Sequence, residues 1–284
     1  MTDFFPHRRG LLAGALALAA TPALVAPTLA RAETTTTTTI KVADRDVELT
    51  IVRPDAPKGV VVFSHGAGAW PAGYAALLDL WAKAGFLVVA PLHVDSQKHP
   101  KRADYTLQTA FPARLADLAA ATAYAAQAAP GLPVAAAGHS YGSLMSLIRG
   151  GALTGMVPAQ DPNVKAVLCF SSAGVIRGLI TPTAYQGVKV PMLMVTGDKD
   201  VMPGVFDDWH EHLYPFETSP AGDKYAWIGK GVDHGLAHHA DAPGFAEASA
   251  LSVIFLKAQV LGDAAARAAL AGQGSTDAAE FRWR

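Results

Sequence analysis

The chain has 284 residues and a formal net charge of −1, a balance that gives no electrostatic reason to expect binding to nucleic acid or to an anionic membrane surface. Its single cysteine, Cys169, excludes an internal disulfide. Cys169 lies in the apolar run 164–170, so we expect a buried and inert thiol.

The first 32 residues have the features of an export signal. Arg8 and Arg9 precede an Ala-rich apolar stretch that ends near Ala30-Arg31-Ala32, where small residues occupy the positions that a signal peptidase reads. Paired arginines favour a Tat-type signal, and a Sec signal with two arginines by chance is the alternative. Either route predicts a periplasmic or secreted protein. The stretch is only moderately apolar, so no stable membrane insertion is expected after signal removal.

The mature chain begins with a threonine run. Residues 33–39 are interpreted as a flexible lead-in, although Thr-rich segments can also pair as an edge strand. Two short strands, 40–42 and 47–52, are expected to form a hairpin around a turn at 44–46. Residues 59–64 are an almost continuous β-branched run, which is typical of a strand buried on both faces of a parallel sheet.

Strand and helix patterns alternate along the rest of the chain. Helices are expected at 74–84, 114–128, after residue 140 and at 244–261, and strands at 86–90, 134–137, 164–170, 191–196 and 224–228. This alternation predicts an α/β fold with a mostly parallel central sheet, an antiparallel N-terminal edge hairpin and helices on both faces. Residues 40–284 are therefore expected to form one domain, without a large cap domain.

The pentapeptide Gly138-His139-Ser140-Tyr141-Gly142 connects a predicted strand to a predicted helix. In a G-x-S-x-G turn, small residues let the strand and the helix crowd together while the strained turn exposes the serine hydroxyl. Because a serine hydroxyl is a poor nucleophile until a base removes its proton, this exposure allows a base to reach it. The context predicts that Ser140 is a nucleophile.

An acid and a base are expected at the carboxyl ends of later strands. Asp198 and Asp200 follow the strand 191–196, and His234 follows the strand 224–228, which gives the chain order Ser, Asp, His. We favour Asp200 over Asp198, because the longer loop lets the carboxylate fold back toward His234. The other aspartate is then a solvated turn residue.

The remaining histidines are weaker candidates for the base. His238 and His239 lie beyond His234 and do not directly follow a strand. His210 and His212 flank Glu211, but one intervening residue places their imidazoles on different sides of a helix, and the H-E-x-x-H spacing is absent. We therefore interpret this segment as a solvated helical face, and we predict no metal.

Ester chemistry also needs backbone N–H groups that stabilise an oxyanion. The first is expected at Tyr141, directly after the nucleophile, and the second at Ala67 in the glycine-rich loop Ser64-His65-Gly66-Ala67-Gly68. Glycines in this loop let the backbone approach a substrate without a Cβ clash.

These motifs together resemble the α/β-hydrolase superfamily, and within it the dienelactone-hydrolase-like and platelet-activating-factor-acetylhydrolase-like esterases. The resemblance spans nearly the whole mature chain and implies a Ser140, Asp200 and His234 triad with Ala67 and Tyr141 as oxyanion donors. Dienelactone hydrolases carry a cysteine nucleophile, whereas this chain carries Ser140. The resemblance therefore implies ester hydrolysis more directly than it implies a dienelactone substrate.

The sequence predicts an exported serine esterase that cleaves small or extended carboxylic esters through an acyl-enzyme, without a metal or organic cofactor. Trp70 and His93 are expected to line the substrate site, and packing against the oxyanion loop is an equal alternative for Trp70. Peptidase, thioesterase, acyltransferase, perhydrolase or polyester hydrolase activity on the same triad stays open. So does a non-catalytic binding protein with this fold.

Overall fold

The computed structural model describes residues 1, 2 and 34–284. Nearly all of the predicted signal, residues 1–32, lies outside the described residues. Within the described chain, no helix has both the length and the apolar character needed to cross a bilayer.

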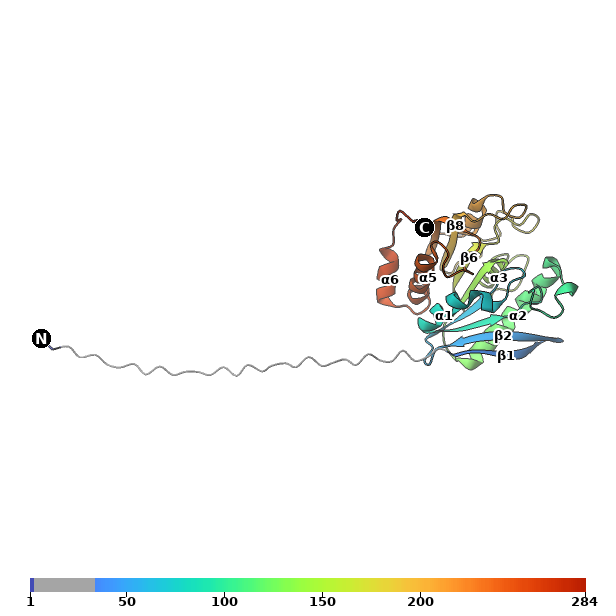
Figure 1. Ribbon diagram of the computed structural model, residues 1–284, viewed down its shortest axis with the longest axis horizontal. Helices are drawn as coiled ribbons and strands as arrows, with labels where there is room; N and C mark the ends of the chain where they lie inside the picture. Colours follow the sequence, from blue (N-terminus) through green and yellow to red (C-terminus); the bar gives the residue numbers. More distant parts are fainter. Residues whose placement is uncertain (3–33) are drawn as a thin grey trace. The chain divides into compact units, whose positions relative to one another are not determined.

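Residues 34–284 contain a nine-stranded sheet with the order β1-β2-β4-β3-β5-β6-β7-β8-β9. Figure 1 shows β1 and β2 side by side at one margin of this sheet. The strands are β1 (Thr34–Val42), β2 (Arg45–Arg53), β3 (Gly59–Ser64), β4 (Phe86–Pro91), β5 (Val134–Ser140), β6 (Val164–Ser172), β7 (Met192–Lys199), β8 (Lys224–Asp233) and β9 (Ala279–Trp283). The strands from β4 to β8 pair in parallel, whereas β1, β2 and β9 pair antiparallel at the two margins. The predicted parallel sheet with an antiparallel N-terminal hairpin is confirmed.

Helices cover both faces of this sheet. They are α1 (Ala75–Lys83), α2 (Leu107–Ala128), α3 (Tyr141–Arg149), α4 (Tyr214–Thr218), α5 (Phe245–Gln259) and α6 (Ala264–Ala271), with the 3-10 turns η1 (Pro71–Tyr74), η2 (Arg102–Asp104) and η3 (Trp209–Leu213). Between α3 and η3, the segments 150–163 and 173–191 contain turns but no helix or strand, so no large cap is present in the described chain.

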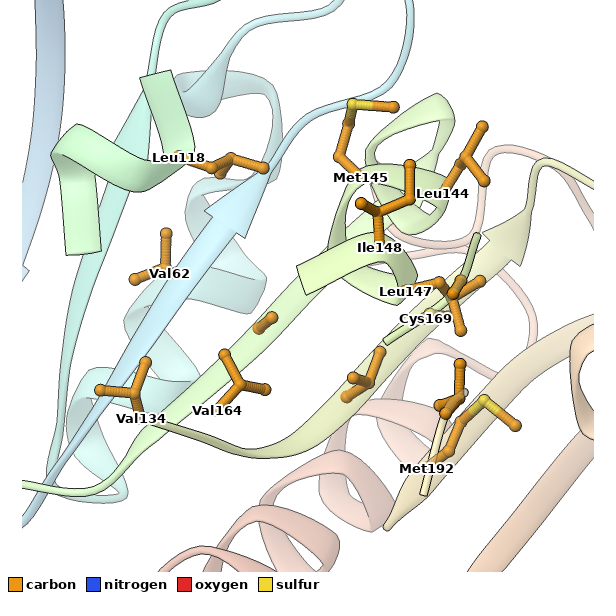
Figure 2. Close-up of a cluster of buried hydrophobic side chains, with 14 of the residues drawn as sticks. Val62, Leu118, Val134, Leu144, Met145, Leu147, Ile148, Val164, Cys169 and Met192 are labelled. Carbon is orange, nitrogen blue, oxygen red and sulfur yellow. The ribbon is translucent and has the colours of Figure 1, made fainter. Parts of the chain in front are cut away.

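Alternate side chains of the central strands point to opposite faces of the sheet and pack into two separate cores. Val60 and Val62 of β3 pack on the face that α2 and α3 cover, whereas Val61 and Phe63 pack on the face of α1, α5 and α6. Figure 2 shows part of the first core, with Leu118 of α2 on the same face as Val62 and with the apolar residues of α3 above the sheet. The buried thiol of Cys169 belongs to this core, as predicted.

The threonine run is the main departure from the predicted organisation. The interpretation of residues 33–39 as flexible is wrong for Thr34–Thr39, which pair antiparallel with β2 as the outer part of β1. β-Branched side chains favour extended backbone, and the partner strand provides a continuous ladder from Arg53 to Arg45. The run is therefore an edge strand with mostly exposed side chains.

Helix α2 begins seven residues before its predicted start at Arg114. Thr106 and Thr109 form a reciprocal capping box at its N-terminus, and the helix continues through Pro112. Pro112 is the sixth residue of the helix and lacks the N–H that would bond to the Gln108 carbonyl, so the helix tolerates the loss of one hydrogen bond there. This extension places Arg114 within a long helix instead of at its beginning.

The turn between β5 and α3 requires glycine on both sides of Ser140. A Cβ at Gly138 would lie 2.3 Å from the Gly142 carbonyl oxygen, and one at Gly142 would lie 1.9 Å from the carbonyl oxygen of Ser64. Real Cβ atoms do not approach backbone so closely. The two glycines thus bring the start of α3 into direct contact with the end of β3.

We expect Gly142→Ala to lower the free energy of unfolding by about 2–3 kcal/mol, because the added methyl forces two backbone segments apart. Urea unfolding of the purified variant measures this change. Gly155→Ala is the matched control, since nothing lies within 4 Å of a Cβ at that exposed turn position. A Gly142→Ala variant as stable as Gly155→Ala would contradict the close packing.

Candidate functional site

Ser140 lies at the apex of a strained turn. Its backbone has φ 53° and ψ −121°, a region that non-glycine residues rarely adopt. β5 ends at Ser140 and α3 begins at Tyr141, so the side chain stands at the carboxyl end of a central strand. Ser140 is 7% exposed to solvent, which is the small exposure expected when a turn presents a hydroxyl at a surface.

Three distant side chains meet at this point. The Ser140 hydroxyl lies 3.0 Å from His234 Nε2, and His234 Nδ1 lies 2.7 Å from Asp200 Oδ1. The carboxylate can only accept, so Nδ1 donates to Asp200 and Nε2 is left to accept from the serine hydroxyl. His234 directly follows β8, and its side chain is 18% exposed, whereas that of Asp200 is fully buried.

Hydrogen bonds keep the buried Asp200 ionised. Burial raises the pKa of this carboxyl, but hydrogen bonds from His212 and His234 outweigh burial and hold the pKa well below its ordinary value. The second oxygen, Oδ2, accepts from the Thr196 hydroxyl at 2.7 Å. The carboxylate is therefore fixed in orientation and negatively charged beside His234.

Asp198, the alternative acid, lies elsewhere. It lies near the end of β7, and its Oδ1 accepts a hydrogen bond of 2.6 Å from the backbone N–H of Gly231, which ties β7 to β8. This is a structural role, and the structure brings Asp200, not Asp198, to His234.

His212 is a second imidazole on the same carboxylate, and the sequence interpretation of it was wrong. His210 is exposed and bonds to Asp208, as a solvated residue would, but His212 is fully buried. Its Nε2 lies 2.9 Å from the Asp200 carbonyl oxygen and 3.1 Å from Asp200 Oδ1, and its Nδ1 lies 2.5 Å from the Ser172 carbonyl oxygen.

Both ring nitrogens of His212 thus face acceptors, which favours the protonated imidazolium. Burial lowers the pKa of His212, but the hydrogen bond and the charge of Asp200 outweigh burial and raise it. The single residue between His210 and His212 could have indicated that only one of them is exposed. In a 3-10 turn, this spacing points one ring outward and the other inward.

Among the described residues, one group of three has ligand atoms close enough together for a metal, namely Asp200, His212 and His234, within 4.8 Å of one another. The hydrogen bonds already described account for this closeness, because both imidazoles donate to oxygens of Asp200.

The predicted oxyanion loop lies directly against the serine. A Cβ at Gly66 would lie 3.5 Å from the Ser140 Cβ, so this loop adjoins the nucleophile turn. Ala67 is exposed, and in the described chain its amide donates to no protein acceptor. Tyr141 is the first residue of α3, where an N–H has no partner within the helix. Both amides are available to an oxygen placed beside Ser140.

The prediction that His93 lines the substrate site is wrong. His93 is fully buried beneath the oxyanion loop, where its Nε2 lies 2.9 Å from the Ser64 hydroxyl and its Nδ1 lies 3.0 Å from Asp117 Oδ2. It follows β4 as predicted, but the chain turns it inward. Trp70 is half-buried next to the loop, with Lys98 Nζ 5.0 Å from its ring centroid.

His139, inside the pentapeptide, is a structural residue that the sequence motif did not indicate. It is buried, its Nδ1 lies 2.9 Å from the Tyr74 hydroxyl, and its Nε2 donates to the His234 carbonyl oxygen at 2.9 Å. Burial, with the neighbouring rings of His234 and His238, holds the pKa of His139 well below its ordinary value. A neutral His139 therefore anchors the backbone of His234.

Residues 55–186 match the hydrolase family described as serine aminopeptidase, S33. No curated protein matches the chain. The fold is similar to solved structures that the chain covers almost completely. A dienelactone hydrolase from Anabaena variabilis ATCC 29413 has a TM-score of 0.62 and 18% identity, over 80% of this chain and 99% of that one.

Two further solved structures share this architecture. TT1662 from Thermus thermophilus has a TM-score of 0.53 and 19% identity, over 80% of this chain and 98% of that one. A predicted CIB-like hydrolase from Thermoplasma acidophilum has a TM-score of 0.53 and 17% identity, over 80% and 99%. These likenesses and the family match support a hydrolase. With its parallel sheet and strand–serine–helix turn, the chain has the α/β-hydrolase fold.

Proposed function

We propose that the protein is a serine esterase that hydrolyses small or extended carboxylic esters. The observation that carries this proposal is the hydrogen-bonded series from the Ser140 hydroxyl through His234 to the buried Asp200. A nucleophile, a base and an orienting acid within hydrogen-bond distance are the requirement for acyl transfer through a serine.

In the proposed reaction, the Ser140 oxygen attacks the ester carbonyl while His234 Nε2 takes the hydroxyl proton. Asp200 stabilises the imidazolium that forms, and the amides of Ala67 and Tyr141 stabilise the oxyanion. The C–O bond to the alcohol then breaks, and His234 returns its proton to the leaving oxygen. A water molecule, deprotonated by His234, then attacks the acyl-enzyme; the bond from the acyl carbon to the Ser140 oxygen breaks, His234 returns the proton to that oxygen, and the acid is released.

Amide hydrolysis is the second candidate, because the matching family is described as a serine aminopeptidase. The same triad serves both reactions, and they differ in the leaving group that His234 must protonate. We favour esters, because resonance stabilises an ester carbonyl less than an amide carbonyl, and an alkoxide leaves more readily than an amide anion. The predicted N-terminal signal adds the proposal that the enzyme is exported and acts in the periplasm or outside the cell.

We expect the wild-type protein to hydrolyse p-nitrophenyl acetate faster than an alanyl p-nitroanilide of equal concentration. Rates across p-nitrophenyl esters of rising chain length then define the acyl preference. An amide rate that exceeds every ester rate would replace the esterase proposal with the peptidase.

We expect Ser140→Ala, His234→Ala and Asp200→Asn each to lower kcat for p-nitrophenyl acetate by at least about 10³-fold, because each removes one member of the triad. A fluorophosphonate probe should label the wild type and not Ser140→Ala. Asp198→Asn is the matched control, since its carboxylate bonds to Gly231 instead of His234. Equal losses in Asp198→Asn and Asp200→Asn would contradict the assigned acid.

We expect the stabilising contribution of His212 to depend on pH. Its folded-state pKa is raised above the ordinary value near 6.5, so the contribution is fully present below about pH 6.5 and is lost as the pH rises through the folded pKa. The difference in unfolding free energy between the wild type and His212→Gln should therefore be larger at pH 6 than at pH 9. His210→Gln, at an exposed position, is the control. A difference that grows toward pH 9 would mean that the buried His212 is neutral.

A further inference from the structure

Behind the oxyanion loop lies a fully buried arginine that the triad mechanism does not use. Arg114, from the middle of α2, forms a two-point ion pair with Asp95, with Nε 2.7 Å from Oδ1 and Nη2 2.8 Å from Oδ2. A buried guanidinium is retained only where its remaining donors also find partners. Those partners here are backbone oxygens of the loop that carries Ala67.

Two carbonyl groups of the loop accept hydrogen bonds from the arginine. Arg114 Nη1 donates to the His65 oxygen at 2.7 Å, and Nη2 donates to the Gly66 oxygen at 3.0 Å. The Gly66 oxygen lies 2.7 Å from His65 Nδ1 and accepts from the amide of Ala69 at 3.2 Å. These hydrogen bonds to the Gly66 oxygen therefore fix the orientation of the peptide group between Gly66 and Ala67.

The orientation of that oxygen decides where the Ala67 N–H points. In a planar trans peptide, the carbonyl of one residue and the N–H of the next point in opposite directions. Because the Gly66 oxygen faces the buried Arg114, the Ala67 N–H faces away from it, toward the exposed side of the loop that adjoins Ser140. A rotation of this peptide would remove the N–H from the site.

The same arginine also contacts the residue that carries the other amide. The Arg114 guanidinium carbon lies 4.7 Å from the centroid of the Tyr141 ring, and the Tyr141 hydroxyl donates to the Leu107 oxygen at the start of α2. Asp95 completes the arrangement, because its Oδ2 accepts from the amide of Gly68 at 3.3 Å. Burial raises the pKa of Asp95, but the hydrogen bond from Arg114 outweighs it and lowers the pKa to about 2.

We propose that Arg114 is a positioning residue for the oxyanion site, which holds the Gly66–Ala67 peptide so that the Ala67 N–H points toward the reacting oxygen. The inference rests on the proposed esterase function, and it goes beyond the triad by assigning the second donor's orientation to a side chain on α2. A residue with this role affects the tetrahedral intermediate more than the bound ester, because the oxygen carries its full charge only in that intermediate.

The test compares Arg114→Lys with Arg149→Lys in the full-length protein. Lysine keeps the charge beside Asp95, but it lacks the planar guanidinium that donates to two carbonyls and to Asp95 at the same time. Arg149 is a partly buried control, with a side chain that is 11% exposed; it pairs with Asp161 at 2.5 Å and donates to the Ala159 oxygen at 3.0 Å, away from the oxyanion loop. Any loss of stability common to both variants thus reports on the loss of an ion-paired guanidinium and not on the oxyanion loop.

We expect Arg114→Lys to lower kcat for p-nitrophenyl acetate by about 10- to 100-fold, with KM changed less than about two-fold, because only the charged intermediate loses its donor. Arg149→Lys should retain at least half of the wild-type kcat. The pH profile of kcat/KM should keep its wild-type midpoint in Arg114→Lys, because the Ser140–His234 pair is unaltered.

A trifluoromethyl ketone provides the second readout. Its carbon is attacked by Ser140, the proton passes to His234, and the ketone oxygen becomes an alkoxide in the oxyanion site. Its inhibition constant should rise in Arg114→Lys by the same factor as kcat falls. A folded Arg114→Lys variant with wild-type kcat and inhibition would overturn the proposal. So would a loss of activity with a shifted pH midpoint, since that would place the damage at the triad.

The two proposals fail separately in this experiment. A wild-type protein that does not hydrolyse the ester, or that hydrolyses it equally well after Ser140→Ala, would overturn the esterase function itself. An active wild type with an inactive Ser140→Ala variant and an unimpaired Arg114→Lys variant would overturn only the role of Arg114.

Discussion

The close contact between the backbone of the nucleophile turn and the end of β3 is the constraint on which the site depends. Gly142 packs directly on the carbonyl of Ser64, so that position has no room for a side chain, and Gly66 lies against His139 and Ser140. This contact brings the first amide of α3 next to the loop that carries Ala67. The parallel pairing of β3 with β5 sets the register, with Ser64 opposite Gly138. Two segments about 75 residues apart thereby form a single rigid unit.

The buried histidines around this unit differ in charge. His93 has an aspartate as a neighbour, yet burial and the charge of Arg114 hold its pKa well below the ordinary value. His212 also lies beside an aspartate, but both of its nitrogens face oxygens that can only accept, whereas the Ser64 hydroxyl can donate to His93, and the pKa of His212 is raised. Asp117 beside His93 is itself hard to ionise, because burial raises its pKa to about 6. Local hydrogen bonding, not distance to a carboxylate alone, therefore decides which ring is charged.

Short-range patterns predicted most of the strands and helices, because alternating apolar runs and glycine-bounded turns are local signals. The chain order of Ser140, Asp200 and His234 also follows from strand ends, and the structure brings these three together. Sequence could not reveal which polar residues face inward. The inward turn of His93 and the burial of His212 depend on the packing of α2 and η3 against the sheet.

Arg114 illustrates the same limit, since nothing in its Ala-rich surroundings indicates a charge buried against loop carbonyls. Its partner Asp95 and its two acceptor carbonyls come from other segments, which only the folded sheet places together. Similarly, β9 returns to pair with β8 after α6, a long-range pairing that local patterns did not predict. Such non-local contacts hold in place the residues that support the sequence motifs of the site.

The strand order also separates the ends of the described domain. β1 and β9 form the opposite margins of the nine-stranded sheet, so eight interstrand spacings lie between them. At about 4.8 Å per spacing, the path across the sheet is roughly 38 Å. A linker that joined the two ends in a circular permutant would need about a dozen extended residues at roughly 3.3–3.6 Å each. Partners fused at the N-terminal and C-terminal margins would accordingly be held on opposite sides of the domain.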